Sequence, residues 1–365
     1  MKIISISYRN FRNLNNGGIL PVDGINVICG NNAQGKTNLL EAIWLFTGGH
    51  SFRGNKDSEL INLIKKDQPA SLTAEFESGG RLQKAVLNID RGKRSSIING
   101  IEKKTGSALI GKVCAVIFSP EHLLLVKEGP QRRRNFIDGA LCQIKPGYAK
   151  VLSKYNRSLI QRNTLLKDIS KHPELWETMD IWNERLVLTG AQVIYERMKY
   201  VDSLSPRVTE IYSGISKNRE IAQISYETLP GSSIEEISAA YREEIKKSEK
   251  TDLKLGFTSV GPHRDDLDIL LNGISARSFG SQGQQRSAVL ALKLAEADIL
   301  EERIGEPPLI LLDDVMSELD ESRQDYLLNH LHKRQVFITC CSPETVNLME
   351  KGRIFTVESG EVKQC

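Results

Sequence analysis

The chain has few cysteines, and none of them has the spacing of a metal site. Its six cysteines include no C-x-x-C pair, and several lie in apolar runs where they are typical of small core residues. We therefore expect no cysteine-based metal centre, and a reducing compartment is the simplest setting. The cysteines are Cys29, Cys114, Cys142, Cys340, Cys341 and Cys365.

Long apolar stretches are also missing. No run of about 18 uncharged apolar residues occurs anywhere in the chain. Residues 1–6 lack the apolar segment of a signal peptide. We therefore expect a cytoplasmic protein that neither spans a membrane nor is exported.

Neither positive nor negative charge dominates the composition. The chain has 49 Lys and Arg against 46 Asp and Glu, a net charge of +3, so a nucleic-acid surface could only be a local patch. What the chain does have is 365 residues with 40% hydrophobic content. That is enough for two or three domains with buried cores.

One complete phosphate-loop pattern, G-x-x-x-x-G-K-[ST], stands at residues 30–37. The apolar run 25–29 predicts a strand before it, and the spacing of apolar residues in 38–46 predicts a helix after it. Its glycines let backbone N–H groups approach phosphate oxygens at a helix N-terminus. We therefore expect ATP to bind at Gly30, Asn31, Asn32, Ala33, Gln34, Gly35, Lys36, Thr37 and Asn38.

Four side chains are predicted to carry the chemistry. Lys36 would reach the β- and γ-phosphates, and Thr37 would offer its hydroxyl to Mg²⁺. Asp313 follows the apolar strand 308–312 and would hold the same ion, while Asp314 would orient the attacking water. Because aspartate is one methylene shorter than the glutamate common at that place in related ATPases, we expect slow hydrolysis.

Two further motifs indicate the class of ATPase. Ser281, Gln282, Gly283 and Gln284 open a predicted helix and resemble the signature motif of ABC-type ATPases, which faces the γ-phosphate bound on another subunit. Residues 317–320 resemble the D-loop of that class, which assigns Ser317 and Asp320 to the same nucleotide. A helix N-cap is the alternative explanation for Ser281 and for Ser317.

A long insertion separates Lys36 from Asp313, as in the ATPase heads of the SMC and RecF kinds. We expect an α/β fold, an ABC-type P-loop ATPase head whose nucleotide lobe combines residues 1–120 and 305–365 around a mixed sheet, with 72–76 and 85–89 as antiparallel strands. Residues 121–304 would form an inserted, compact, mainly helical lobe that carries the signature motif. We expect the helices of this inserted lobe to break at Pro146, Pro173, Pro206, Pro230 and Gly231. These breaks exclude a long coiled coil.

Over its whole length the chain resembles the RecF family of bacterial recombination mediators. The resemblance implies a weak, DNA-stimulated ATPase that dimerises with ATP and binds single- and double-stranded DNA in gap repair and replication-fork maintenance. It also implies work with RecR and RecO in loading RecA, and a place for Arg12 at the nucleotide. The matching segments are residues 8–13, 30–37, 119–121, 129–138, 261–267 and 281–286.

The residues themselves give thinner support for DNA binding. Arg91, Lys93 and Arg94 fall in a predicted hairpin turn, and Arg132, Arg133 and Arg134 form the densest basic cluster. Phosphate contacts need only such charges on one face. The alternative explanations are a solvated surface, which is the usual role of such a charge run, and buried salt bridges at Arg133 or Arg134.

Two other functions use the same loop. The ATPase subunit of an ABC transporter would need a membrane partner and a shorter insertion. A P-loop phosphotransferase would not need the motifs at 281–284 and 317–320. The glutamine loop stays unassigned near residues 119–121, and Cys340, Cys341 and Ser342 stand where ABC-type ATPases carry a switch histidine.

Overall fold

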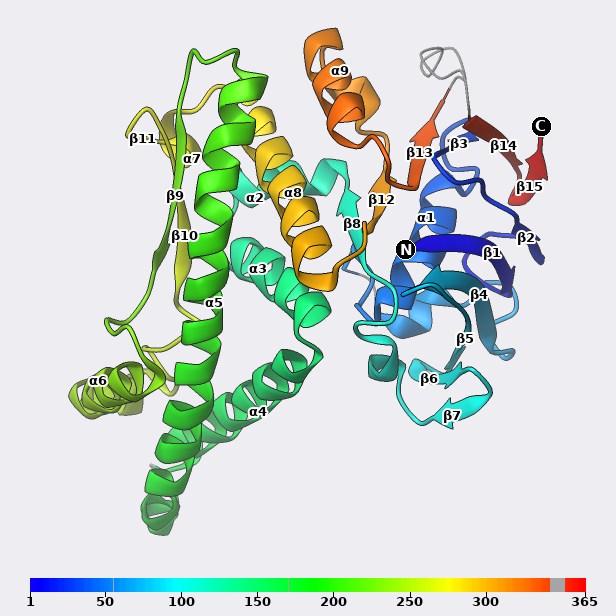
Figure 1. The fold of residues 1–365 in the computed structure, drawn as a ribbon. Helices are drawn as coiled ribbons and strands as arrows, with labels where there is room; N and C mark the ends of the chain where they lie inside the picture. Colours follow the sequence, from blue (N-terminus) through cyan, green and yellow to red (C-terminus); the bar gives the residue numbers. More distant parts are fainter. Residues whose placement is uncertain (55, 170, 342–351) are drawn as a thin grey trace. The chain divides into compact units, whose positions relative to one another are not determined.

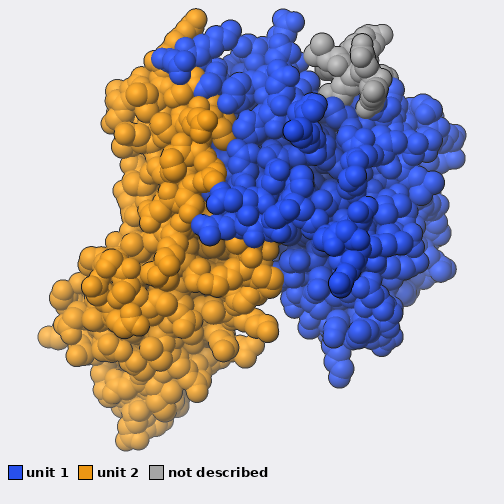
Figure 2. Space-filling view, viewed as in Figure 1, with its two compact units in different colours: residues 1–124, 214–218, 286–365 blue, residues 125–213, 219–285 orange. Residues whose placement is uncertain are grey.

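The computed structural model describes residues 1–54, 56–169, 171–341 and 352–365. Within them the chain forms two compact units (Figure 2). Unit 1 corresponds to the predicted nucleotide lobe. The sequence predicts that the second segment of that lobe begins at residue 305, whereas in the structure it begins at Arg286. Unit 1 comprises Met1–Leu124, Gly214–Asn218 and Arg286–Cys365, and unit 2 comprises Leu125–Ser213 and Arg219–Gln285.

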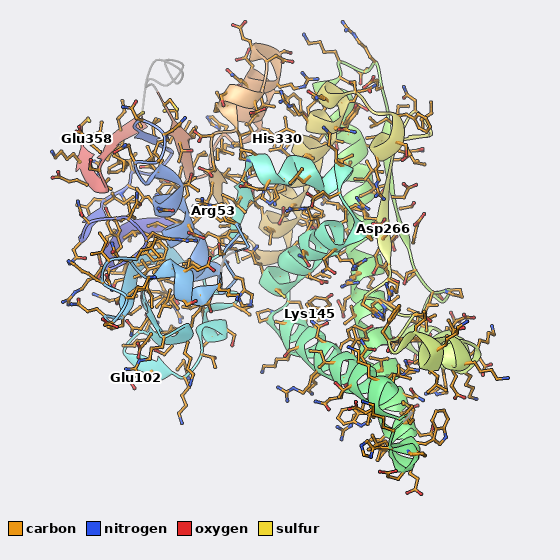
Figure 3. The ribbon with its side chains drawn as sticks, turned by 180° about the vertical axis from the view of Figure 1, so that it is seen from behind. Arg53, Glu102, Lys145, Asp266, His330 and Glu358 are labelled. Carbon is orange, nitrogen blue, oxygen red and sulfur yellow. The ribbon has the colours of Figure 1, made fainter. Side chains whose placement is uncertain are left out.

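Helix α8 (Gln282–Ile304) explains the shifted boundary. Its residues 288–297 are all buried, as expected for a helix that is surrounded by core. Farther along, Asp298 accepts hydrogen bonds from His330 at 3.0 Å and from Arg334 at 2.7 Å, and both partners belong to unit 1. His330, labelled in Figure 3, is the last residue of α9 (Glu321–His330). These contacts make most of α8 part of unit 1.

The first sheet of unit 1 is antiparallel, in the order β2-β1-β4-β5-β6-β7. Fully buried side chains alternate along β4 with partly exposed ones, which is typical of a strand with one face on a core. Leu72 lies opposite Leu87 in the antiparallel pair of β4 and β5, so the prediction of 72–76 and 85–89 as antiparallel strands is confirmed. The strands are β1 (Lys2–Arg9), β2 (Gly17–Ile19), β4 (Ala70–Ser78), β5 (Arg81–Asp90), β6 (Lys93–Ile98) and β7 (Ile101–Lys103).

The second sheet of unit 1 is mixed, in the order β15-β14-β3-β13-β12-β8 (Figure 1). All its pairings are parallel except that of β15 with β14. The sequence predicts one sheet in this lobe, but the structure has two, because tight turns such as Gly79-Gly80 pair β4 to β7 with each other and with β1 and β2, while β3 joins the mixed sheet. The strands are β3 (Ile25–Cys29), β8 (Ala115–Phe118), β12 (Leu309–Leu312), β13 (Val336–Cys340), β14 (Gly352–Glu358) and β15 (Glu361–Gln364).

One apolar core joins both sheets of unit 1 to helix α1 (Lys36–Trp44). Leu39 and Ile43 of α1, Leu72 of the antiparallel sheet and Phe337 of the mixed sheet are all fully buried in it. Since parallel strands end at the same edge of a sheet, the residues that follow β3, β12 and β13 are brought together there.

Unit 2 is mainly helical, with a small antiparallel sheet in the order β11-β10-β9. Among the described residues, no helix has both the length and the apolar character to cross a membrane. The helices that lie wholly or mostly in unit 2 are α2 (Leu124–Lys127), α3 (Pro130–Ile144), α4 (Pro146–Asp168), α5 (Met179–Ile215), α6 (Ile234–Leu255) and α7 (Ala276–Phe279). The strands are β9 (Ala222–Glu227), β10 (Asp266–Leu271) and β11 (Ile274–Ser275).

The helix break expected at Pro206 is wrong. This proline lies inside α5, which continues to Ile215. Proline removes one backbone hydrogen bond of the helix, a local cost of about 3 kcal/mol. The neighbouring Leu204 and Val208 are buried at 0% and 1% exposure, and their packing offsets that cost.

A buried histidine in unit 2 should make stability depend on pH. His263 accepts a hydrogen bond from Tyr155 at Nδ1 (2.6 Å) and donates from Nε2 to the Thr258 carbonyl (3.0 Å). Burial lowers the pKa of His263 to about 4. The unfolded chain takes up this proton near pH 6.5, so stability is lost as the pH falls from about 6.5 towards 4.

We expect His263→Gln to reduce the acid sensitivity of unit 2. The difference in unfolding free energy between pH 7 and pH 5 should shrink by about 2 kcal/mol, the linkage contribution of this one group. Urea denaturation at both pH values measures it. His50→Gln, at an exposed position, is the matched control and should leave the difference unchanged. An equal pH dependence in parent and His263→Gln would rule this explanation out.

Candidate nucleotide-binding site

The phosphate loop connects the end of β3 to the start of α1, as the sequence predicts. Gly30 and Gly35 have φ angles of 155° and 119°, in the region that favours glycine. A Cβ at Gly30 would lie 2.3 Å from the Val357 carbonyl oxygen. One at Gly35 would lie 2.9 Å from a Leu14 methyl carbon, so both positions require glycine for space as well as for conformation.

The side chain of Lys36 is folded into this loop. The residue is 4% exposed, and its Nζ donates to the carbonyl oxygens of Gly30 at 2.6 Å and of Asn31 at 3.2 Å. These oxygens fix the ammonium group where the loop backbone turns. The arrangement suits a cation that receives phosphate oxygens, because the group is already desolvated and oriented.

Thr37 and Asp313 lie side by side although they are far apart in the chain. The hydroxyl of Thr37 donates to Asp313 Oδ1 at 2.8 Å, and Thr339 of β13 donates to the same oxygen at 3.0 Å. Burial raises the pKa of Asp313 to about 6. A cation at this carboxylate would favour its charged form.

This pair fits Mg²⁺. Hydroxyl and carboxylate oxygens are the ligands that Mg²⁺ takes from proteins, usually one or two of them together with water and substrate phosphates. No group of three or more His, Cys, Asp or Glu side chains suited to a metal occurs among the described residues. Thr37 and Asp313 would therefore share the ion with a nucleotide.

Asp314 is held in an unusual backbone conformation next to this pair. Its φ is 51°, uncommon for a residue other than glycine, and its N–H donates to the hydroxyl of Thr339 at 2.8 Å. Thr339 thus contacts both acids. Sequence reasoning missed it, although a threonine near the end of a buried strand that reaches the same sheet edge was a usable signal.

The D-loop residues make local contacts. Ser317 donates to the Asp314 carbonyl at 2.8 Å, and Asp320 is the N-cap of α9, accepting from the Arg323 N–H at 2.9 Å. The helix cap suggested for Ser317 therefore falls on Asp320 instead, and Ser317 closes the turn after the two acids.

The signature residues form the N-terminus of α8. Ser281 Oγ accepts from the Gln284 N–H at 3.2 Å, and Gln284 Oε1 accepts from the Ser281 N–H at 2.8 Å, which is a capping box. Gln284 also donates to Glu220 at 2.6 Å. Ser281 and Gln282 are exposed and Gly283 is partly exposed. These residues belong to unit 2, and the phosphate loop to unit 1.

Other residues assigned to the nucleotide pair within unit 1. Arg12 donates from Nε and Nη2 to the two carboxylate oxygens of the buried Glu41, at 2.8 and 3.0 Å. Asn38 donates to Asn13 at 2.6 Å, and Gln34 accepts from the Ser359 N–H at 2.5 Å. Asn32 and Ala33 are exposed on the loop. The Glu41 partner of Arg12 was not foreseen.

Two thiols stand near Lys36 where a switch histidine would be expected. Cys341 is exposed, with its sulfur 3.7 Å from Lys36 Nζ and 3.2 Å from Asn32 Oδ1. Cys340 is buried at the end of β13. Ser342 lies outside the described residues.

The basic cluster at 132–134 is largely interior, which argues against a DNA contact for two of its members. Arg133 is 3% exposed and Arg134 is 7% exposed. Arg133 forms a two-pronged ion pair with Asp266 at the start of β10 (labelled in Figure 3), and Arg134 donates to the Asp265 carbonyl at 2.6 Å. Arg132 alone is exposed, and it pairs with Glu128.

The hairpin cluster divides in the same way. Arg91 and Gly92 form the tight turn between β5 and β6, with φ angles of 48° and 74°. Arg91 and Lys93 are exposed and available to phosphate. Arg94 is not, because its side chain is 8% exposed and pairs with Asp57 and the Gly49 carbonyl.

Comparison with known proteins places the whole chain in one family. Residues 2–363 match the family described as RecF/RecN/SMC N terminal domain. The chain is 40% identical to the DNA replication and repair protein RecF of Ruminiclostridium cellulolyticum, over 100% of both chains. It is also 40% identical to that of Agathobacter rectalis, over 100% of this chain and 99% of the relative.

Solved structures that resemble this chain support the same family assignment. The recombination mediator protein RecF in the RecFOR pathway, solved as RecF-ATP, matches with a TM-score of 0.92 and 37% identity over 100% of this chain and 97% of that one. The Smc head domain of Pyrococcus furiosus matches with a TM-score of 0.57 at 17% identity, over 100% of this chain and 95% of that one, and so shares the fold alone. With the fold, the phosphate loop and these full-length relatives in agreement, the chain belongs to the RecF family of DNA replication and repair proteins.

Proposed function

We propose that this chain is an ATP-switched DNA-binding protein of recombinational gap repair and replication-fork maintenance, active in the cytoplasm. The observation that carries the proposal is the assembled pair of Thr37 and Asp313 beside Lys36, in a chain whose 37%-identical relative was solved with ATP. Full-length similarity to RecF proteins supports this function over the transporter and phosphotransferase alternatives.

The residues would divide the work as follows. Lys36 and the loop N–H groups bind the phosphates, and Thr37 and Asp313 hold Mg²⁺, which neutralises phosphate charge. Asp314 orients the attacking water, and its short side chain keeps turnover slow. Ser281 and Gly283 of a second copy would complete the site, so that ATP joins two subunits.

In its pathway the ATP-bound dimer would bind single- and double-stranded DNA at gaps and work with RecO and RecR in loading RecA. The exposed Arg91 and Lys93 remain candidate phosphate contacts, together with Arg132. We further propose that DNA stimulates hydrolysis and that hydrolysis releases the DNA. Such a cycle links nucleotide state to DNA affinity, as thermodynamic coupling requires.

Ser281→Arg tests the dimer. The exposed serine lies outside the unit that holds Lys36, so the variant should bind ATP as a monomer nearly as well as the parent. It should fail to sediment as a dimer with Mg²⁺ and ATP, and it should lose turnover. Ser278→Arg, three residues earlier and also exposed, is the matched control.

Mixing two variants provides the decisive measurement. Ser281→Arg combined with Lys36→Ala can form a hybrid with one intact site, because each chain supplies what the other lacks. Turnover above that of either variant alone would support a shared site. Reduced ATP affinity in the dilute Ser281→Arg monomer would show instead that Ser281 lines the pocket of its own subunit.

Asp314→Asn tests hydrolysis as the release step. The amide keeps the size of the side chain but removes its charge, so ATP and Mg²⁺ should still bind while turnover falls roughly 100-fold. Dissociation from gapped DNA in Mg²⁺-ATP, followed by fluorescence, should slow together with turnover. Asp325→Asn on the exposed face of α9 is the control. Unchanged dissociation would end the release model while leaving the ATP site intact.

A further inference from the structure

Two buried thiols face each other at the start of the phosphate loop. Cys29 and Cys340 are register partners on the neighbouring parallel strands β3 and β13, with their sulfurs 3.0 Å apart. They are 2% and 5% exposed, and together with Val27 they form a small apolar cluster. The proposed nucleotide chemistry uses neither sulfur.

The placement of these thiols allows a covalent bond. Neighbouring strands lie about 4.8 Å apart, within the range of Cα separations that disulfides span. The sulfurs need to approach by about 1 Å to reach bonding distance. The two thiols share one hydrogen bond; this bond, first, and the Lys36 ammonium, second, lower the pKa of Cys29. The same pairing raises the pKa of Cys340, so Cys29 is the better nucleophile.

We propose that Cys29 and Cys340 form a reversible disulfide when they meet a peroxide-class oxidant, and that this bond weakens nucleotide binding at the adjoining loop. The second half of the inference rests on the proposed nucleotide site. The Cys29 thiolate attacks one peroxide oxygen and breaks the O–O bond, giving a sulfenic acid, and the leaving oxygen takes up the proton that the thiol released, giving an alcohol or water. The Cys340 sulfur then attacks the sulfenic sulfur, forming the disulfide and releasing water.

The loop has little room to absorb this movement. Gly30, the next residue after Cys29, donates its N–H to the Cys340 carbonyl at 3.3 Å and accepts from Lys36 Nζ at 2.6 Å. On its other side the Val357 carbonyl leaves no space for even a Cβ. Drawing the two sulfurs together therefore displaces Gly30, and with it the carbonyl oxygen that positions the phosphate-binding lysine.

Cys341 is the competing target and has to be separated in the test. It is exposed, and its sulfur lies 3.7 Å from Lys36 Nζ. Oxidation there would also disturb the nucleotide site, but it would not need Cys340. Cys114 is a buried thiol of unit 1 just before β8, and it serves as a control for general thiol damage.

The experiment treats the full chain with hydrogen peroxide and compares it with its own reduced form. We expect a mass loss of about 2 Da, a non-reduced peptide that links Cys29 to Cys340, and loss of two of the six thiols titrated in denaturant. Affinity for a fluorescent ATP analogue should fall roughly tenfold, about 1.4 kcal/mol, and dithiothreitol should restore it. Cys341→Ser and Cys114→Ala should respond like the parent, whereas Cys340→Ala should keep the affinity of its reduced form.

The outcomes separate the two proposals. Reduced parent protein that fails to bind the ATP analogue overturns the nucleotide site itself. Normal binding when reduced, with no Cys29–Cys340 link after peroxide, overturns the disulfide alone. A link without a change in affinity overturns its regulatory effect. Loss of affinity that persists in Cys340→Ala and disappears in Cys341→Ser assigns the effect to Cys341 and contradicts the pair.

Discussion

Lys36→Ala is expected to lower ATP turnover by at least about 100-fold and to weaken ATP binding. The parent ammonium is buried and is positioned by the carbonyl oxygens of Gly30 and Asn31. Without it, those oxygens would face phosphate oxygens with no cation between them, and removal of one such electrostatic contact costs about 10²–10³ in rate. Phosphate release and binding of a fluorescent ATP analogue measure the two effects.

The control for this variant is Lys112→Ala, at an exposed turn of unit 1. It should hydrolyse ATP at the parent rate. Circular dichroism of both variants confirms that the fold is kept. If Lys36→Ala also turned over ATP like the parent, the assignment of the phosphate loop would be wrong.

Arg133→Ala is expected to lower the free energy of unfolding by about 3 kcal/mol. Its guanidinium donates to Asp266 at 2.6 and 2.8 Å and to the carbonyls of Leu125 and Glu128, each at 2.9 Å. Removal leaves those acceptors without their donor in a largely buried place. The cost lies at the low end of the range for a broken buried ion pair, because Asp266 is 24% exposed. Urea denaturation measures it.

Arg132→Ala, one residue earlier, is the matched control. Its partner Glu128 is a surface residue, so the change should cost less than about 0.5 kcal/mol. DNA binding separates the two roles further. If Arg132 binds a DNA phosphate, its removal should also make the affinity for DNA less dependent on salt concentration. Parental stability in Arg133→Ala together with weaker DNA binding would restore Arg133 as a DNA-binding residue.

These arginines show where a linear pattern stops being informative. In the sequence, Arg132, Arg133 and Arg134 suggest one basic surface patch. On a helix such as α3, however, successive side chains point about 100° apart. Arg132 therefore reaches solvent while Arg133 and Arg134 enter the interior of unit 2. Which face of a helix is covered depends on residues such as Asp266, far away in the sequence. The hairpin residue Arg94 differs from Arg91 and Lys93 for the same kind of reason, its partner being Asp57.

The lobe boundary and Pro206 give the same lesson for the fold. Helix α8 begins with a recognisable motif, but its membership in unit 1 is decided by burial along 288–297 and by contacts of Asp298 with His330 and Arg334. Proline predicts a helix break from local geometry alone. In α5 the packing of Leu204 and Val208 outweighs that local preference.

The sequence by itself determined the phosphate loop, the two acids after a buried strand, and the antiparallel strands at 72–76 and 85–89, because each depends on neighbouring residues or on strand periodicity. Only the tertiary structure decided that Thr37 meets Asp313, that Thr339 contacts both acids, and that Cys29 faces Cys340. Thr37 and Asp313 are 276 residues apart and Cys29 and Cys340 are 311 apart, while Thr339 and the two acids lie on or after neighbouring strands, 25 and 26 residues apart. Their meeting follows from the parallel order of β3, β13 and β12, which no local pattern in the chain encodes.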